Sequence, residues 1–276
     1  MPDSTVNANV YKDCNMASSD IRGAGPGIAT VFSSRSPDKT TGNEDTAAII
    51  QLDNESAILI VADGVGGLPA GGQASSLVVD AIHRNVKSAW RKHNDIRHAI
   101  LSGIEEANQK IVDSTNGSAT TLAVVEIQGN RVRTYHVGDS MIMVAGQRGK
   151  LKMETISHSP VGYAVEAGVM SEEEAILHDD RHIVSNVVGS QDMHISMGIA
   201  MTLAPRDTLL VASDGLFDNI HRDDIIEIIR KGNLGHCSDR LSGMARKRME
   251  DSVPPFKPDD LTFILFRLSV AGKSTI

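Results

Sequence analysis

Acidic residues recur in short clusters where apolar stretches of the chain end. Asp63 directly follows the apolar run 57–62, Asp214 follows the run 208–213, and a glycine comes after each aspartate. Two apolar strands that end in carboxylates bring negative charge to one edge of a core, where repulsion is costly unless a cation neutralises it. The clusters that share this character are Asn43-Glu44-Asp45, Asp63-Gly64, Gly138-Asp139-Ser140, Asp214-Gly215 with Asp218, and Asp259-Asp260.

These clusters share oxygen atoms, which are hard metal ligands. Carboxylates without histidine or cysteine partners suit Mg²⁺ or Mn²⁺, which prefer octahedral oxygen ligands, better than they suit zinc. A single Asp-Gly pair is more simply explained by a tight turn, because aspartate caps turns and glycine accepts a positive φ. The recurrence of the pair after two apolar runs favours a metal site.

The elements around these clusters can be read from the hydrophobic pattern. The runs 57–62, 208–213 and 261–268 predict buried strands, and the segment 119–145 predicts an antiparallel meander with turns at 128–130 and 138–140. Apolar residues at three- and four-residue spacings predict helices over 73–90 and 96–112, and further helices over 223–231 and around 240–249. Strand-rich stretches with helical pairs between them indicate an α+β fold of antiparallel sheets covered by helices.

Composition excludes several classes of protein. The chain has 276 residues with 41% hydrophobic and 22% charged residues, which is typical of a globular protein and not of a disordered one. A net charge of −8 argues against nucleic acid or an anionic membrane as a partner. With only Cys14 and Cys237, and with no apolar run near the ~18 residues that cross a bilayer, we expect a cytoplasmic location.

The motifs resemble, in order and spacing, those of the type 2C metal-dependent Ser/Thr protein phosphatases of the bacterial, single-domain type. The resemblance covers roughly residues 28–268 and implies a β-sandwich with a pair of helices on each outer face. Six motifs carry it: Asn43-Glu44-Asp45, Val61-Ala62-Asp63-Gly64-Val65-Gly66-Gly67, Ser118-Ala119-Thr120-Thr121, Val137-Gly138-Asp139-Ser140, Ala212-Ser213-Asp214-Gly215-Leu216-Phe217-Asp218 and Asp259-Asp260-Leu261-Thr262.

The resemblance implies a role for each acidic position. Asp63 bridges two metal ions, one of which also takes the Gly64 carbonyl, while Asp214 and Asp259 hold the other. Glu44 and Asp45 lie beside them and hold water, and Asp139 and Asp218 match positions associated with a further metal. The residues expected to carry catalysis are therefore Asp63, Asp214, Asp259 and Asp45, with Mn²⁺ or Mg²⁺ as cofactor.

The implied activity is hydrolysis of phosphoserine and phosphothreonine in proteins by a water activated between two divalent metals, without a phosphoenzyme. The implied partners are phosphorylated proteins, among them a cognate Ser/Thr kinase or its substrates. The alternative is a catalytically weak relative that binds phosphorylated partners or regulates a kinase. The retained acidic positions favour the enzyme, because a binding module has no need to assemble this much repulsive charge.

Four positions depart from the family pattern. Thr40 stands where many members have an arginine that holds the substrate phosphate; the adjacent Lys39 is the candidate substitute, although an ammonium lacks the planar fork of a guanidinium. Val65 stands where eukaryotic members have histidine. Ser157 stands where bacterial members usually have aspartate. Asn186 stands where they often have arginine.

Two segments lie outside the predicted core of the domain. Residues 1–27 are polar with little periodicity and predict a flexible extension, which leaves 28–270 as the catalytic domain. Residues 157–192 are polar, with an expected capping box of Ser171 and Glu174, and predict a mobile flap beside the metal site. A surface excursion without a function is the alternative for this second segment.

Overall fold

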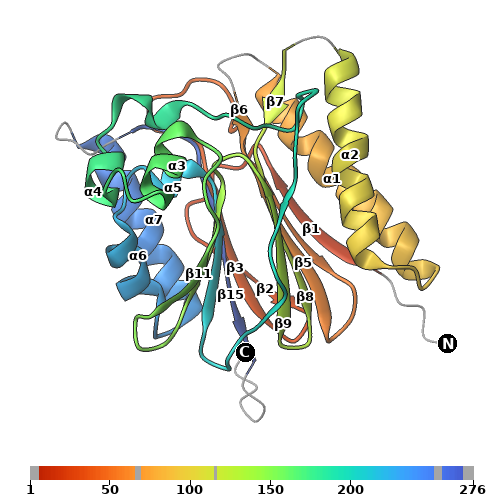
Figure 1. Ribbon diagram of the computed structural model, residues 1–276. Coiled ribbons are helices and arrows are strands. Elements are labelled where there is room, and N and C mark those ends of the chain that lie inside the picture. Colours follow the sequence, from red (N-terminus) through yellow and green to blue (C-terminus); the bar gives the residue numbers. More distant parts are fainter. Residues whose placement is uncertain (1–5, 66–69, 115–116, 252–256, 270–276) are drawn as a thin grey trace.

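Two antiparallel sheets pack face to face, and a pair of helices covers the outer face of each (Figure 1). The computed structural model describes residues 6–65, 70–114, 117–251 and 257–269; residues 1–5 of the predicted extension and the motif residues Gly66 and Gly67 lie outside these ranges. The predicted α+β sandwich with helices on both faces is confirmed.

The first sheet is covered by α1 (Gly71–Arg91) and α2 (Ile96–Ser114), and the second by α6 (Arg222–Ile229) and α7 (Leu234–Glu250). In the described chain the strand order of the first sheet is β1 (Asn7–Lys12), β4 (Thr46–Gln51), β5 (Ser56–Ala62), β8 (Leu122–Gln128), β9 (Arg131–Val137) and β12 (Ser196–Met197), with β13 (Met201–Thr202) also on β9. The second sheet has the order β11 (Leu151–Glu154), β10 (Met141–Ala145), β14 (Thr208–Ala212), β15 (Leu261–Leu268), β3 (Gly27–Ser34) and β2 (Asp20–Ala24).

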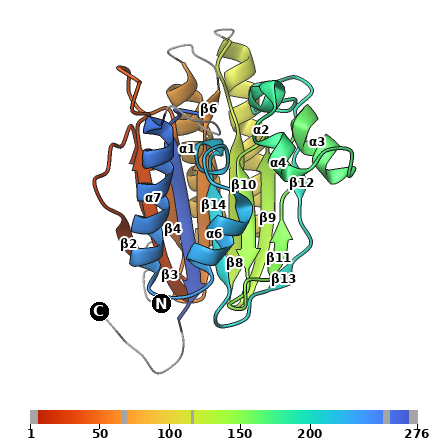
Figure 2. The ribbon, with the colours of Figure 1, turned by 90° about the vertical axis from the view of Figure 1, so that its left-hand side faces the viewer.

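Three apolar layers hold the sandwich together, one between the two sheets and one between each sheet and its helices. Figure 2 looks onto the helix-covered face of the second sheet, with α6 and α7 in front. Strand β5 shows why its sequence is continuously apolar: Ile58 and Ile60 pack toward α1 and α2, whereas Leu59 and Val61 pack toward the second sheet. Successive side chains of a strand point to opposite faces, so a strand buried on both faces needs an apolar residue at every position. Such strands are the ones that the sequence predicts most directly.

The predicted meander is wrong at its third strand. Strands β8 and β9 pair in the first sheet, but β10 pairs with β14 in the second sheet. The chain changes sheets at Gly138, whose φ of +96° is a conformation that residues with a Cβ rarely adopt. The crossing places Asp139 between the two sheets instead of on a hairpin turn of one sheet.

The predicted flexible extension is wrong for residues 6–27. Strand β1 pairs with β4, and β2 pairs with β3, so this segment forms the edges of both sheets. Tyr11 Oη donates a hydrogen bond to Asp20 Oδ2 at 2.8 Å and joins the two edges. An edge strand keeps one face and one side open to solvent, so its sequence lacks the apolar run that predicts a buried strand.

Cys14 and Cys237 are free thiols. Within the described ranges, no helix has the length and apolar content needed to cross a bilayer.

Candidate metal centre

The registers of the sheets bring the acidic loops to one end of the sandwich. In the first sheet, Thr46 pairs with Ala62, so the residues next to them, Asp45 and Asp63, lie side by side. In the second sheet, Ala212 pairs with both Met141 and Phe263, which aligns the loops that carry Asp139, Asp214 and Asp259. Antiparallel pairing thus explains why residues at the start of some strands meet residues at the end of others.

Hydroxyl groups connect the two sheets beneath this end. Ser213 Oγ donates to Asp45 Oδ2 at 2.9 Å, which ties β14 to the loop before β4. Thr121 N donates to the Asp63 carbonyl at 2.8 Å, and Thr121 Oγ1 lies 2.7 Å from Ser140 Oγ. The backbones that carry Asp63 and Asp139 are therefore fixed to each other through Thr121.

A cleft of about 430 Å³ opens over these loops. Asp45 is 1% exposed and lies behind the cleft, and Asp218 faces an adjoining cavity of about 680 Å³ that shares Asp139 and Asp214 with it. The structure thus brings all of the predicted site residues together. Those that line the cleft itself are Lys39, Glu44, Asp63, Gly64, Asp139, Asp214 and Asp259.

The carboxylates perturb one another strongly. Burial, followed by the charges of Asp45, Asp214, Asp259 and Asp139, raises the pKa of Asp63 well above its usual range. In this crowded set every ionised oxygen is costly, so the carboxylates hold protons or attract cations.

The pKa values of four neighbouring carboxyl groups are raised as well. Burial is the largest cause in each, and it raises the pKa of Asp45 and Asp139 to about 8, of Asp259 to about 7 and of Asp218 to about 6. The charge of Asp260 adds to the effect at Asp45, and the charge of Asp214 adds to it at the other three.

Lys257 is a member of this centre that the sequence patterns missed. Its Nζ donates to Asp214 Oδ2 at 2.5 Å and to Asp218 Oδ2 at 2.8 Å, and it lies 3.2 Å from Asp259 Oδ2. Burial alone would raise the pKa of Asp214, but the charge and hydrogen bond of Lys257 outweigh it and lower that pKa. The signal was the position of Lys257 two residues before Asp259.

The donor set fits a hard divalent cation. Asp45 Oδ1 and Asp214 Oδ1 are buried atoms without a hydrogen-bond partner in the described part of the chain, and carboxylate oxygens are the ligands that Mg²⁺ and Mn²⁺ prefer. Over the same residues, no three acidic, histidine or cysteine side chains are arranged to hold an ion as they stand. Three of the carboxylates, Asp214, Asp218 and Asp259, instead turn an oxygen toward the ammonium of Lys257.

Lys39 also lines the cleft, and its ammonium is bound by two carboxylates. Its Nζ donates to Glu44 Oε2 at 2.5 Å and to Asp260 Oδ2 at 2.7 Å. Asp260 is 3% exposed and also accepts hydrogen bonds from the backbone N–H groups of Ser36 and Glu44. Burial lowers the pKa of Lys39, but the two carboxylates more than compensate and raise it. The contacts assign Lys39 to bracing Glu44, while Thr40 is exposed.

The segment 157–192 is anchored at both ends by His158. Gly138 N and Asn186 Nδ2 donate to His158 Nδ1 at 3.1 and 2.8 Å, so the ring proton is on Nε2, which lies 2.9 Å from Ser196 Oγ. Asn186, one of the departures from the family pattern, is therefore a buried structural residue. Between the anchors lie α3 (Pro160–Glu166), α4 (Glu172–Ala175) with the expected Ser171–Glu174 capping box, and the 3₁₀ turn Asp179–His182.

A four-layered α-β-β-α sandwich with this acidic cleft defines the chain as a metal-dependent hydrolase of phosphate esters. The family model for protein phosphatase 2C matches residues 37–238. The chain belongs to the protein phosphatase 2C family, whose members are Ser/Thr protein phosphatases.

Individual relatives agree with this assignment. The chain is 33% identical over 220 residues to a protein phosphatase 2C-type protein of Streptococcus pyogenes, covering 76% of this chain and 88% of that one. It is 30% identical over 202 residues to the protein phosphatase PhpP of Streptococcus pneumoniae, covering 69% and 80% of the two chains. Among solved structures, the Ser/Thr phosphatase Stp1 of Staphylococcus aureus has a TM-score of 0.75 at 26% identity, with 88% and 95% covered.

Proposed function

We propose that this phosphatase removes phosphate from phosphoserine and phosphothreonine in proteins with Mn²⁺ or Mg²⁺ bound in the acidic cleft. The observation that carries the proposal is the convergence of Asp63 with Asp45, Asp139, Asp214 and Asp259 from separate loops of both sheets. Such mutual repulsion persists in a folded protein where a bound cation compensates it. The alternative, a non-catalytic binding module, leaves this convergence without a purpose.

The chain's own residues supply binding and orientation. We assign Asp63, the Gly64 carbonyl, Asp214 and Asp259 to the two principal cations, Glu44 and Asp45 to the positioning of water, and Asp139 and Asp218 to the outer side of the centre. Bound divalent cations would lower the pKa of coordinated water and offset charge on the phosphoryl oxygens. A contact between Lys39 and the substrate phosphate stays a prediction. In the structure the Lys39 ammonium is bound to Glu44 and Asp260 and not directed to an open phosphate site.

Removal of metal tests the proposal. Phosphopeptides carrying phosphoserine or phosphothreonine are expected to be hydrolysed in Mn²⁺ or Mg²⁺, to be left intact after the protein is dialysed against a chelator, and to be hydrolysed again when metal is restored. Released phosphate is the measurement, with a phosphotyrosine peptide of the same sequence as the control. Because uncatalysed hydrolysis of phosphate monoesters is extremely slow, background is negligible. Undiminished turnover in chelator would falsify the metal mechanism.

We propose a cytoplasmic location and phosphorylated partners that include a cognate kinase or its substrates. The free thiols of Cys14 and Cys237 support a reducing compartment. Cell fractionation tests the location, and an unchanged phosphoproteome in cells lacking the protein would contradict the assignment of partners.

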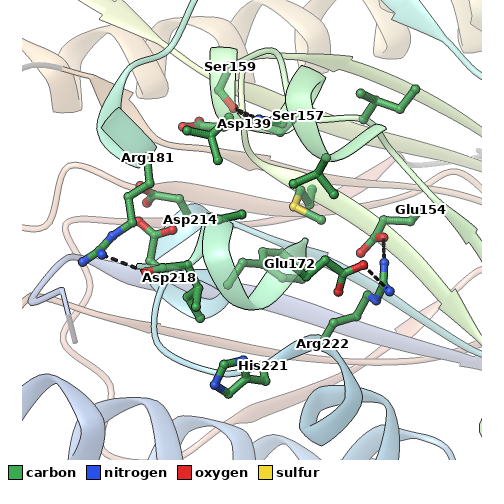
Figure 3. A pocket seen from close by; sticks show the side chains of 18 of the residues that line it. Asp139, Glu154, Ser157, Ser159, Glu172, Arg181, Asp214, Asp218, His221 and Arg222 are labelled. Carbon is green, nitrogen blue, oxygen red and sulfur yellow. Dashed lines mark hydrogen bonds and ion pairs between the residues drawn. The ribbon is translucent and has the colours of Figure 1, made fainter. Parts of the chain in front are cut away.

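We also propose that residues 157–192 form a flap that discriminates among phosphoproteins. The 680 Å³ cavity lies between the flap and the α5–α6 region, where α5 is Asp214–Phe217, and Figure 3 shows Asp139, Asp214 and Asp218 at one side of it and Arg222 with Glu154 and Glu172 at the other. Glu166, Glu173, Asp223 and Asp224 also line it, so most of its charged side chains are acidic, and apolar side chains such as Val161, Ile176 and Phe217 lie between them. A cavity continuous with the metal centre is suited to contact the protein segment around a phosphorylated residue.

Replacement of residues 160–182 by a Gly-Ser linker tests the flap while keeping the His158 and Asn186 anchors. We expect turnover of a phosphoprotein to fall by a larger factor than turnover of a small chromogenic phosphate ester, because the ester does not reach beyond the metal centre. The ratio of the two kcat/KM values is the measurement. An equal loss on both substrates would indicate a structural role, and no loss on either would exclude a flap function.

A further inference from the structure

The backbone of Lys257 is held in place by hydrogen bonds to the side chain of Asn219. Lys257 N donates to Asn219 Oδ1 at 2.9 Å, and Asn219 Nδ2 donates back to the Lys257 carbonyl at 2.9 Å. The same Nδ2 donates to the Gly215 carbonyl at 2.9 Å, and Asn219 is only 1% exposed. These bonds attach Lys257 to the helix that begins with Asp214, so its ammonium is aimed at the carboxylates by a buried amide.

The two carboxylate oxygens of Asp214 have different surroundings, because only one of them bonds the ammonium of Lys257. Asp214 Oδ2 accepts from Lys257 Nζ, which also bonds Asp218, whereas Asp214 Oδ1 is buried and has no partner within the described ranges. Asp214 Oδ1 is therefore available to a cation in the cleft, whereas Asp214 Oδ2 faces the ammonium of Lys257. Nζ forms ion pairs with Asp214, Asp218 and Asp259, at 2.5, 2.8 and 3.2 Å, so three carboxylates surround the positive charge of Lys257.

A divalent ion and an ammonium cannot share these oxygens. A cation bound to both Asp218 and Asp214 Oδ2 would lie next to Nζ, which already bonds these two carboxylates, and like charges in a partly buried site repel each other strongly. The positive charge of Lys257 also offsets part of the negative charge of Asp214 and Asp218 that would attract such an ion.

We propose that Lys257 is a built-in cation that takes the place of a divalent ion on the Asp214–Asp218 side of the centre. The inference rests on the proposed metal-dependent function and extends it: the enzyme binds metal in the cleft through Asp63, Asp214 Oδ1 and Asp259, and keeps the outer side free of metal. Asp259 is the most distant of the three carboxylates around Nζ, at 3.2 Å, whereas Asp214 and Asp218 accept hydrogen bonds from it.

Direct metal binding tests the inference without turnover. Mn²⁺ is titrated into substrate-free protein, and free Mn²⁺ is followed by electron paramagnetic resonance to obtain the number of ions bound and their Kd values. Lys257→Met, which keeps length but not charge, is expected to bind one more Mn²⁺ per chain than the wild type. Lys257→Arg is expected to bind the wild-type number, because it retains the charge.

The matched control is Lys152→Met. Lys152 Nζ donates to the buried Asp207 at 2.6 Å, so this variant also removes a lysine from a partly buried ion pair, but away from the centre, and should bind the wild-type number of ions. Far-UV circular dichroism checks folding, and Lys257→Gln replaces Lys257→Met if the latter unfolds. Identical numbers and Kd values in wild type and the uncharged Lys257 variant would overturn the inference while leaving the metal mechanism intact. Absence of Mn²⁺ binding by the wild type would overturn both.

Discussion

Asp63→Asn is expected to abolish nearly all phosphatase activity, with kcat lower by on the order of 10²-fold or more. Burial, followed by the charges of four surrounding carboxylates, raises the pKa of Asp63, so this residue lies at the electrostatic centre of the cleft. Cations that activate water contribute several kcal/mol, and each ~1.4 kcal/mol is a factor of ten in rate. The measurement is kcat at saturating Mn²⁺ on both a phosphopeptide and a chromogenic phosphate ester.

Asp53→Asn supplies the matched control for this substitution. Asp53 lies just before the other end of strand β5, is exposed and accepts a hydrogen bond from Glu55 N, which an asparagine side chain can also accept. The control should retain wild-type kcat. Because the Asp63 carboxylate is repelled by its neighbours in the metal-free state, Asp63→Asn should not lower the metal-free Tm. A lower Tm together with a proportionate loss of activity would indicate misfolding instead of a catalytic role.

The buried strands could be predicted from sequence because their burial is nearly complete, and the long helices because one face of each is buried at regular spacing. Strand β15 has the predicted bounds, and α1 and α2 extend the predicted helices by only a few residues. The edge strands β1 and β2 could not be predicted, since an exposed edge imposes no apolar pattern on its residues. The change of sheet at Gly138 was also hidden, because a turn residue has the same sequence signature whether the chain returns to its own sheet or crosses to another.

The acidic members of the site could be predicted for a related reason. Asp63 and Asp214 follow strands that are recognisable by themselves, so their places at a strand end were visible without the fold. Lys257 and Asp260 depended on the fold. The charge of Lys257 becomes part of the centre only because Asn219 holds its backbone, and Asp260 pairs with Lys39 from a segment 221 residues away in the chain.

A second large effect is expected at Gly215, where α5 lies against the backbone at the entry of β15. A Cβ on Gly215 would lie 2.0 Å from the backbone carbonyl oxygen of Asp260, and two backbones cannot separate without moving α5 away from the entry of β15. Asp214 begins α5 and Asp259 precedes β15, so this movement would pull apart two carboxylates assigned to the same cation. It would also strain the Asn219 contacts that hold Lys257.

Gly215→Ala is therefore expected to lower both stability and activity. Overpacking typically costs 1–3 kcal/mol, and contact with backbone places this case at about 3 kcal/mol, which corresponds to a fall in Tm of roughly 6–12 °C for a chain of this size. Activity measured well below the transition should still be strongly reduced, since the folded variant has a widened centre.

Gly243→Ala is the matched control for this change, because Gly243 lies within α7 and a Cβ there would meet nothing within 4 Å. In a helix interior, alanine is favoured over glycine by roughly 0.8–1.0 kcal/mol, so the control should raise Tm and retain activity. If Gly215→Ala instead kept the wild-type Tm and kcat, the close approach of α5 to β15 could not be what sets the spacing of Asp214 and Asp259. A fall in Tm with full activity at low temperature would mean that the backbones can separate without moving the two carboxylates.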